Sequence, residues 1–230
     1  MEFKKAKRDI SREGYPPEKY FVDQFNVTAE QYHQFKELLE KNAGETDIDA
    51  FLKKNLAILS NALRFFNTGH HGTWIIPQQE IKPPTDTPGL KPDYILGGRS
   101  SDGFQWWVID LKGSNKSIFS ESQYRTRFSL ETNKGVFQVL QYMDYCAEMQ
   151  AYLREGLSLT EFREPCGLLI IGKEKELNEN PLRRKLKSAW NRISSEKLMV
   201  RTYDALLREV EAKLEGKKMI ESMRDGTYYQ

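Results

Sequence analysis

Two residues that could do chemistry together stand at the end of one apolar segment. Asp110 and Lys112 close FQWWVIDLKG, residues 104–113, which is otherwise largely apolar and predicts a buried strand. Strand side chains alternate between two faces. We therefore expect Asp110 and Lys112 to emerge side by side on one face at the end of this strand.

A further acid precedes them on the neighbouring segment. Asp93 opens KPDYILGGR, residues 91–99, and the intervening SSDG is a turn signal that favours a hairpin. Pairing outward from that turn brings Asp93 close to Asp110. Two carboxylates and the ammonium of Lys112 would then converge at one end of a sheet.

This combination suits metal-assisted hydrolysis of phosphodiester bonds. Mg²⁺, or Mn²⁺ in its place, takes oxygen ligands, usually one or two carboxylates completed by water and substrate phosphate. The metal activates a bound water and neutralises charge on the phosphate. Lys112 beside it could orient or deprotonate the nucleophile and stabilise the anionic transition state.

A polar stripe lies on the helix expected over residues 133–155. Spacings of three and four residues place four amide and phenol side chains on one face, namely Gln138, Gln141, Tyr142 and Tyr145. Gln141 and Tyr145 could point at the site and position a water or a phosphate. The stripe could equally pack on the sheet, and both interpretations stay open.

Each candidate also has a plainer interpretation. Asp93 could cap a turn, and Asp110 with Lys112 could form an exposed ion pair on an edge strand, which contributes little stability. His70 and His71 are a rival metal or base signal. No second histidine or cysteine cluster lies at ligand spacing from them, however, and their segment is typical of a loop.

The elements that must position these residues follow from the apolar periodicity. Helices are expected over 29–42, about 46–63, 133–155, 181 to about 193 and 204 to about 219, and strands over 71–81, 91–99, 104–113, 167–172 and 197–203. Residues 114–130 lack a period and are expected to form a long loop. The order predicts an α/β (α+β) fold with a mixed sheet flanked by helices.

The near-balanced net charge of +2 does not indicate a nucleic-acid binder, so any such function would need local basic patches. Arg125 and Arg127 in the long loop are one candidate, and there Tyr124 and Phe128 could stack on bases. The basic segment PLRRKLKSAWNR is another, although a solvated helix face is the usual explanation for such a segment.

Cysteine usage and hydropathy indicate the compartment. Cys146 and Cys166 form no metal-ligand pair, which is typical of reduced thiols in a cytosolic protein. The N-terminal residues lack the apolar core of a signal peptide. No run approaches the roughly 18 apolar residues of a membrane span. We expect a soluble, cytoplasmic protein without a membrane partner.

Several short motifs carry a resemblance to known nucleases. PDYIL followed by IDLKG resembles the PD-(D/E)xK nuclease signature, and QYMDY resembles the QxxxY motif found downstream of it. The α-β-β-β-α-β order matches the restriction-endonuclease-like core of that superfamily. GETDIDAFLKKNLAIL resembles a feature of the Shedu family of antiphage nucleases and related mismatch-specific endonucleases, in which a glutamate opens a helix before the core.

The resemblance implies a role for six residues. Asp93 and Asp110 would be metal ligands, Lys112 the catalytic lysine, Gln141 and Tyr145 supporting site residues, and Glu45 an accessory acid. Glu45 could instead be an ordinary acid at a helix start, where the helix dipole favours it. The resemblance also implies DNA as the partner and a homo-oligomeric state.

Two functions from different classes remain. The first is a Mg²⁺-dependent DNA endonuclease in antiphage defence, with an arm and helix at residues 1–43 before a nuclease-like domain at 44–230. The alternative is a non-catalytic nucleic-acid-binding or assembly module that retains the nuclease fold.

Overall fold

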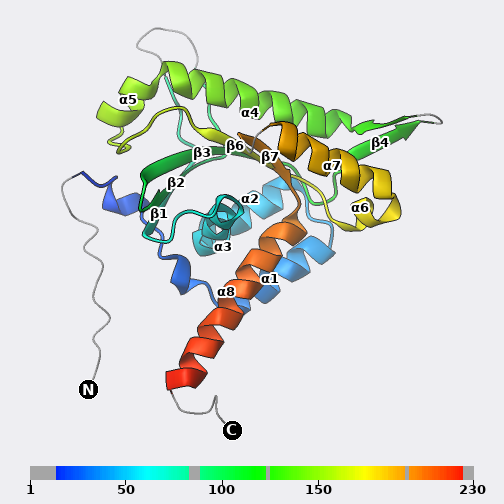
Figure 1. Cartoon of the computed structure of the whole chain (residues 1–230), viewed down its shortest axis with the longest axis horizontal. Coiled ribbons are helices and arrows are strands. Elements are labelled where there is room, and N and C mark those ends of the chain that lie inside the picture. The colour runs from blue at the N-terminus through cyan, green and yellow to red at the C-terminus, as the bar shows by residue number, and fades with distance from the viewer. Residues whose placement is uncertain (1–13, 83–88, 123–124, 195–196, 225–230) are drawn as a thin grey trace.

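A five-stranded mixed sheet forms the centre of the protein in the computed structural model, which describes residues 14–82, 89–122, 125–194 and 197–224. In the order β1-β2-β3-β6-β7, the strands comprise Gly72–Pro77, Tyr94–Ser100, Gly103–Leu111, Cys166–Ile170 and Leu198–Arg201. β1, β2 and β3 form an antiparallel meander, whereas β3, β6 and β7 run parallel. This mixed sheet between helices (Figure 1) confirms the predicted α/β (α+β) fold class.

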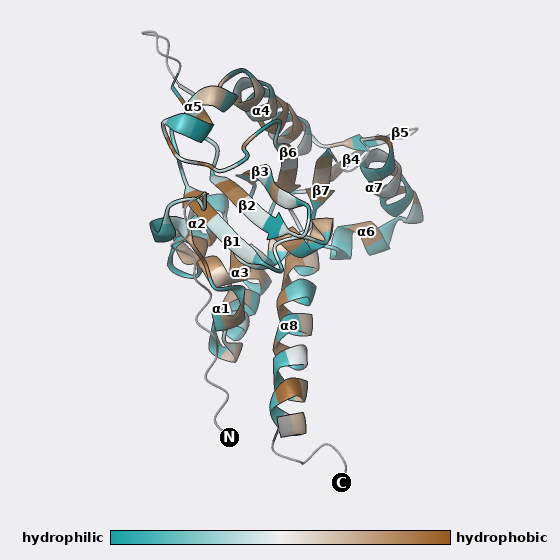
Figure 2. Ribbon diagram, turned by 60° about the vertical axis from the view of Figure 1, so that its left-hand side comes forward, coloured by the Kyte–Doolittle hydropathy of each residue, from teal (hydrophilic) through white to brown (hydrophobic). Residues whose placement is uncertain are grey.

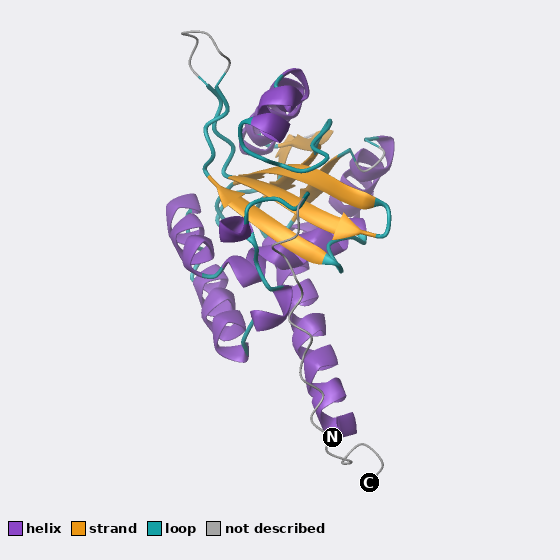
Figure 3. Cartoon of the chain, turned by 90° about the vertical axis from the view of Figure 1, so that its left-hand side faces the viewer, coloured by secondary structure: helices purple, strands orange, loops and turns teal. Residues whose placement is uncertain are grey.

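Helices cover both faces of the sheet (Figure 3). One face carries α1 (Ala29–Glu40), α2 (Glu45–Lys54), α3 (Leu56–Ser60), η3 (Asn61–Phe66) and α8 (Tyr203–Arg224). The other carries α4 (Leu130–Glu148), α5 (Gln150–Glu155), α6 (Lys175–Glu179) and α7 (Pro181–Ile193). Two short 3-10 turns, η1 (Glu18–Tyr20) and η2 (Gln24–Asn26), precede α1.

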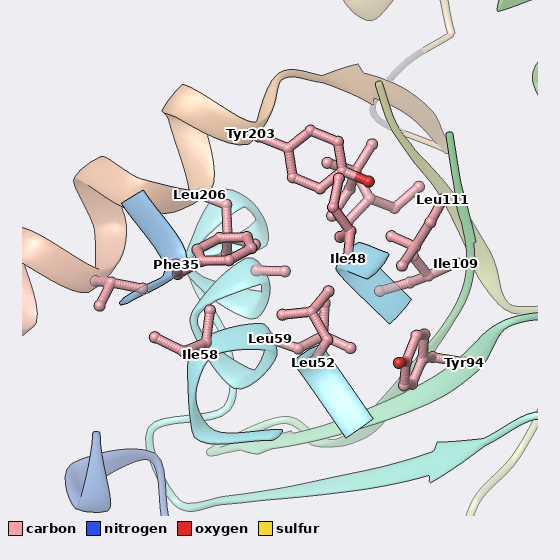
Figure 4. Close-up of a cluster of buried hydrophobic side chains, with 14 of the residues drawn as sticks. Phe35, Ile48, Leu52, Ile58, Leu59, Tyr94, Ile109, Leu111, Tyr203 and Leu206 are labelled. Atoms are coloured by element: carbon pink, nitrogen blue, oxygen red, sulfur yellow. The ribbon is translucent and has the colours of Figure 1, made fainter. Parts of the chain in front are cut away.

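Each face of the sheet packs against its own hydrophobic core. The strands are apolar on both faces because helices cover both. The core beneath α1, α2 and α8 includes the buried side chains of Phe35, Ile48, Leu52, Tyr94 and Tyr203 (Figure 4). The helices themselves carry both hydrophilic and hydrophobic residues (Figure 2), as expected for elements with one buried side. The central strands are therefore held firmly on both sides.

α4 lies very close to β6. A Cβ atom added to Gly167 of β6 would lie 2.4 Å from Cγ1 of Val139 on α4, and one added to Gly135 of α4 would lie 2.6 Å from a methyl carbon of Leu169. Glycine at both positions therefore permits this approach. The close contact fixes the helix that carries the polar stripe.

Three local expectations are corrected by the structure. The segment 114–130 is not a structureless loop, because β4 (Phe119–Ser122) and β5 (Arg125–Phe128) pair in it as an antiparallel ribbon. The helix expected over about 46–63 is divided into α2, α3 and η3. Its first break falls at Asn55, whose backbone is not helical. The helix expected over 133–155 is interrupted at Met149, between α4 and α5.

The division into residues 1–43 and 44–230 stays a prediction. Phe35 and Leu39 of α1 are nevertheless buried in the same core as α2 and α8. The helix of the first segment therefore packs directly on the second.

Candidate active site

Asp110 and Lys112 lie at the carboxyl end of β3, in the middle of the sheet. Asp110 is 2 % exposed and Lys112 is 8 % exposed, and Nζ of Lys112 lies 2.8 Å from Oδ2 of Asp110. The backbone of Lys112 is fixed, since its N–H donates to Ile170 O and its carbonyl accepts from the Tyr203 hydroxyl. The alternative of an exposed ion pair on an edge strand is therefore wrong.

Asp93 lies opposite Asp110, as the hairpin predicted. Tyr94 pairs with Ile109, so the residues that follow outward from this pair are Asp93 and Asp110. The Asp93 carboxylate is half-buried, and its Oδ2 accepts a hydrogen bond of 2.7 Å from the backbone N–H of Leu111. The hydrogen bond between Asp93 and Leu111 thus crosses from β2 to β3, beside the Asp110–Lys112 pair.

Glu45 is a third acid at this end of the sheet. It is the first residue of α2, and its Oε2 lies 3.8 Å from Nζ of Lys112. The backbone also approaches closely here, because a Cβ atom on Gly113 would lie 3.2 Å from the Glu45 nitrogen. Glu45 therefore occupies a helix start and contacts the site, so the two interpretations of this residue are compatible.

Burial and mutual repulsion govern the charges of this cluster. Burial raises the pKa of Asp110 to about 7, although Lys112 opposes the shift, and Asp93 and Glu45 add to it. Burial also raises the pKa of Asp93, against the hydrogen bond from Leu111. For Lys112, burial lowers the pKa, but the three acids outweigh it and the net shift is upward. Three carboxyl groups thus share one ammonium.

The residues present fit a hard divalent cation held by few protein ligands. No group of three or more His, Cys, Asp or Glu side chains suited to a metal occurs among the described residues. Two carboxylates suffice for Mg²⁺ when water and phosphate complete the shell. The buried Oδ2 of Asp110 already lies 2.8 Å from the Lys112 ammonium. The fit to a cation therefore rests on the donor set, two carboxylates on paired strands at one end of the sheet.

The α4 stripe contributes a residue that the motif did not single out. The pKa of Tyr142 is raised to about 12, first by burial and then by Asp110, Asp93 and Glu45, so this side chain lies near the acidic cluster. Gln141 is exposed, and Tyr145 packs among the hydrophobic side chains below α4. The site roles of Gln141 and Tyr145 stay predictions.

A network of hydrogen bonds next to Asp93 was not predicted from the sequence. The Tyr94 hydroxyl donates to Oδ1 of Asp49 at 2.7 Å, and Lys53 lies 2.6 Å from Oδ2 of the same carboxylate. Asp49 lies one helical turn after Glu45 on α2. That i, i+4 spacing was the available sequence signal. The network ties α2 to β2 next to Asp93.

The rival histidines lie far from this cluster. His70 and His71 are exposed and precede β1, whose first residue pairs with Arg99. Asp93 lies beyond the other end of the same strand pair, since Pro77 pairs with Tyr94. The six paired positions span five intervals of about 3.3 Å, so the two ends lie roughly 17 Å apart. The histidines therefore belong to no common site with Asp93.

Fold and site together define an α/β protein with a buried carboxylate–lysine cluster at the end of its central strands. The family model described as Shedu protein SduA, C-terminal, matches residues 42–207, and the chain belongs to this family. The matched span includes all six predicted site residues. No curated protein matches the chain. None of the described helices is long and apolar enough to cross a membrane.

Proposed function

We propose that the protein is a metal-dependent DNA endonuclease of the PD-(D/E)xK type. Family membership suggests a role in antiphage defence. The observation that carries the proposal is the convergence of Asp93, Asp110 and Lys112, with Glu45 beside them, at one end of the sheet. A buried acid with a raised pKa beside a buried lysine is typical of a functional site.

In this proposal Asp93 and Asp110 hold a Mg²⁺ or Mn²⁺ ion. When bound, such an ion lowers the pKa of a ligated water and offsets charge on the scissile phosphate. The backbone of Lys112 is held by Tyr203 and Ile170, and its ammonium lies 2.8 Å from Asp110 and 3.8 Å from Glu45. Its pKa is raised in this cluster. It therefore donates to an anionic phosphoryl oxygen, and this donation stabilises the transition state.

The α4 face would complete the site. Tyr142 lies near the acidic cluster, and its phenolic hydrogen would be donated to a phosphate oxygen or a water. Gln141 and Tyr145 remain proposed supporting residues, which would require the phosphate backbone to lie along α4. Glu45 would act as the accessory acid, through its contact with Lys112.

The β4–β5 ribbon offers a contact surface for DNA. Phe119 and Phe128 pair across the ribbon and pack inward, with Phe128 against Trp190 of α7. Phe128 is therefore not available for base stacking, and Tyr124 lies outside the described residues. Arg125 and Arg127 are exposed on the ribbon and form no ion pair with a described residue. A two-stranded ribbon fits the major groove of duplex DNA.

Plasmid cleavage tests the proposal. Full-length protein should cleave plasmid with Mg²⁺ or Mn²⁺ and lose this activity in EDTA. Lys112→Ala should reduce the rate by roughly 10²–10⁴-fold. Lys116→Ala is the matched control, since Lys116 is an exposed lysine in the adjoining loop. Equal cleavage by the Lys112→Ala and Lys116→Ala proteins would refute the assigned role of Lys112.

The alternative is a non-catalytic binding or assembly module, in which Asp110 and Lys112, 2.8 Å apart and buried, form an ion pair that serves the fold alone. That function predicts DNA binding or self-assembly that EDTA leaves unchanged and that survives neutral substitution of both Asp93 and Asp110. The same preparations distinguish the two functions.

A further inference from the structure

A cavity of about 300 Å³ lies between α7 and the edge strand β7, away from the acidic cluster. Figure 1 shows α7 beside β7, with α6 and the start of α8 nearby. Four basic residues line the cavity, namely Arg184, Lys187, Arg192 and Arg201, and Glu174 is its one acidic residue among the described part of the chain. The lining therefore carries a surplus of positive charge.

The carboxylate of Glu174 is already paired with an arginine of α8. Both of its carboxylate oxygens accept from the guanidinium of Arg208 on α8, at 2.6 and 2.7 Å. A paired, bidentate arrangement of this kind is a strong charge-assisted contact. Glu174 therefore does little to balance the other cations of the cavity.

Lys187 is the least favourably placed of these cations. It is half-buried and forms no ion pair with any residue in the described ranges. Its pKa falls to about 8, mainly because of burial and then because of Arg201, with Arg208 and Arg184 adding and Glu174 opposing. Burying an ammonium among like charges costs stability. Such a cost is expected where an anionic ligand relieves it.

The wall of the cavity is rigid. Oδ1 of Asn191 on α7 accepts from the Val200 N–H, and its amide nitrogen donates to the Val200 carbonyl. This side chain thus closes the free edge of β7 and fixes the helix beside it. The Arg192 guanidinium is in turn oriented by a hydrogen bond of 2.9 Å to the Ser188 hydroxyl. The Arg192 guanidinium and the helix that carries it are therefore held in place before any ligand arrives.

We propose that this cavity binds a phosphoryl group, carried either by a free phosphate compound or by a nucleic-acid strand. Guanidinium groups match the oxygens of a phosphate with parallel hydrogen bonds, and a lysine adds a compact charge. Arg201 ends β7 in register with Ile170, which pairs with Leu111 next to Lys112. The cavity thus lies two strands from the acidic cluster, at the same end of the parallel strands. The proposal does not rest on nuclease activity.

Pyrophosphate is the probe that tests this site. Isothermal titration of the full-length protein should show saturable binding above a sodium chloride control of equal ionic strength. Lys187→Met should weaken that binding by at least about tenfold. Lys185→Met is the matched control, because Lys185 is exposed on the same helix and does not line the cavity. Its affinity should remain within about twofold of the wild-type value.

Thermal unfolding separates loss of the site from loss of the fold. In phosphate-free buffer the Lys187→Met protein should have a higher Tm than wild type, since a disfavoured charge is removed. Absence of saturable binding by the wild-type protein would overturn the proposal. Equal affinities of the Lys187→Met and Lys185→Met proteins would also overturn it.

Competition then identifies the source of the phosphoryl group. If a short DNA duplex in EDTA displaces pyrophosphate from the wild-type protein, the cavity holds a phosphate of the nucleic-acid backbone. If a nucleoside triphosphate displaces it and the duplex does not, the ligand is a free phosphate compound. Both results uphold a phosphoryl site and assign its occupant.

Discussion

Asp110 is the residue in which stability and proposed activity conflict most clearly. It is almost fully buried, and its one ammonium neighbour also serves Asp93 and Glu45. The folded state therefore favours the protonated form of Asp110. An acid that is costly to ionise in the unliganded protein is the group that would gain most from a bound cation.

The Asp110→Asn substitution should stabilise the protein at alkaline pH. Because the pKa of Asp110 is raised to about 7 from 3.8, the folded state binds its proton more tightly than the unfolded state does. The stabilisation that the Asp110 proton gives to the folded state is therefore largest in acid, and it declines as pH rises from about 4 to about 7. The neutral amide avoids this decline. Denaturation at pH 8 should show a gain of about 1–3 kcal/mol.

That gain should shrink as the pH is lowered towards 4. Asp102→Asn is the control, since Asp102 is exposed at the β2–β3 turn, and it should change stability little at either pH. If Asp110→Asn were less stable than wild type at pH 8, Asp110 would be ionised and well compensated by Lys112, contrary to the account.

The site residues differ in how far the sequence could predict them. Asp93, Asp110 and Lys112 belong to one hairpin, so strand alternation and a local turn were sufficient to bring them together. Tyr142 lies near the cluster because of how α4 is placed and rotated on the sheet. That rotation depends on the tertiary packing of α4 against β6, which sequence spacing along α4 does not reveal.

Among the elements, the β4–β5 ribbon was missed for a physical reason. Its strands are four residues each and mostly polar, so they lack the alternating apolar pattern that indicates a strand. Remote contacts hold it instead. The Glu176 carboxylate accepts from the backbone N–H groups of Ile118 and Phe119 at 2.7 and 2.8 Å, and Arg183 pairs with Glu121 at 2.9 Å.

The exposed arginines of the ribbon should contribute to DNA affinity. The double substitution Arg125→Ser and Arg127→Ser should weaken binding of a duplex in EDTA and reduce the slope of log affinity against log salt by about 2. Fluorescence anisotropy over a salt series would measure both quantities. Arg163→Ser is the matched control, because Arg163 is exposed before β6, at the opposite end of the parallel strands. An unchanged salt slope in the double variant would exclude the ribbon as a DNA contact.

At the scale of the whole molecule, the fold class followed from the order of elements, but the sheet order did not. β3 pairs with β6, and β6 with β7, across long connections that include helices. Such parallel pairings depend on helix packing and not on a local turn. The β1-β2-β3 meander was predictable because its pairing follows the chain.

For the whole molecule, the prediction concerns association of several copies of the chain. Leu130, Phe137 and Leu140 of α4 are 68 %, 66 % and 42 % exposed, and spacings of seven and three place them on one stripe. Exposed apolar stripes often mark contacts between proteins. We propose that this stripe contributes to a homo-oligomer. Light scattering should give a wild-type mass above the 26.9 kDa of one chain, and Phe137→Glu should lower it.

Ile193→Glu is the control for that substitution, since Ile193 is 82 % exposed on α7, away from the α4 stripe. It should leave the mass unchanged. A wild-type mass equal to one chain, or an unchanged mass for Phe137→Glu, would count against the stripe.

Metal binding is the direct measure of whether Asp93 and Asp110 hold a cation, because it does not require DNA cleavage. Mn²⁺ would be titrated into the full-length protein, with the free ion followed by electron paramagnetic resonance. Wild type and the Asp102→Asn control should bind Mn²⁺ saturably, and Asp110→Asn should bind it at least about tenfold more weakly. Equal binding of Mn²⁺ by wild type and Asp110→Asn would contradict the proposed metal site.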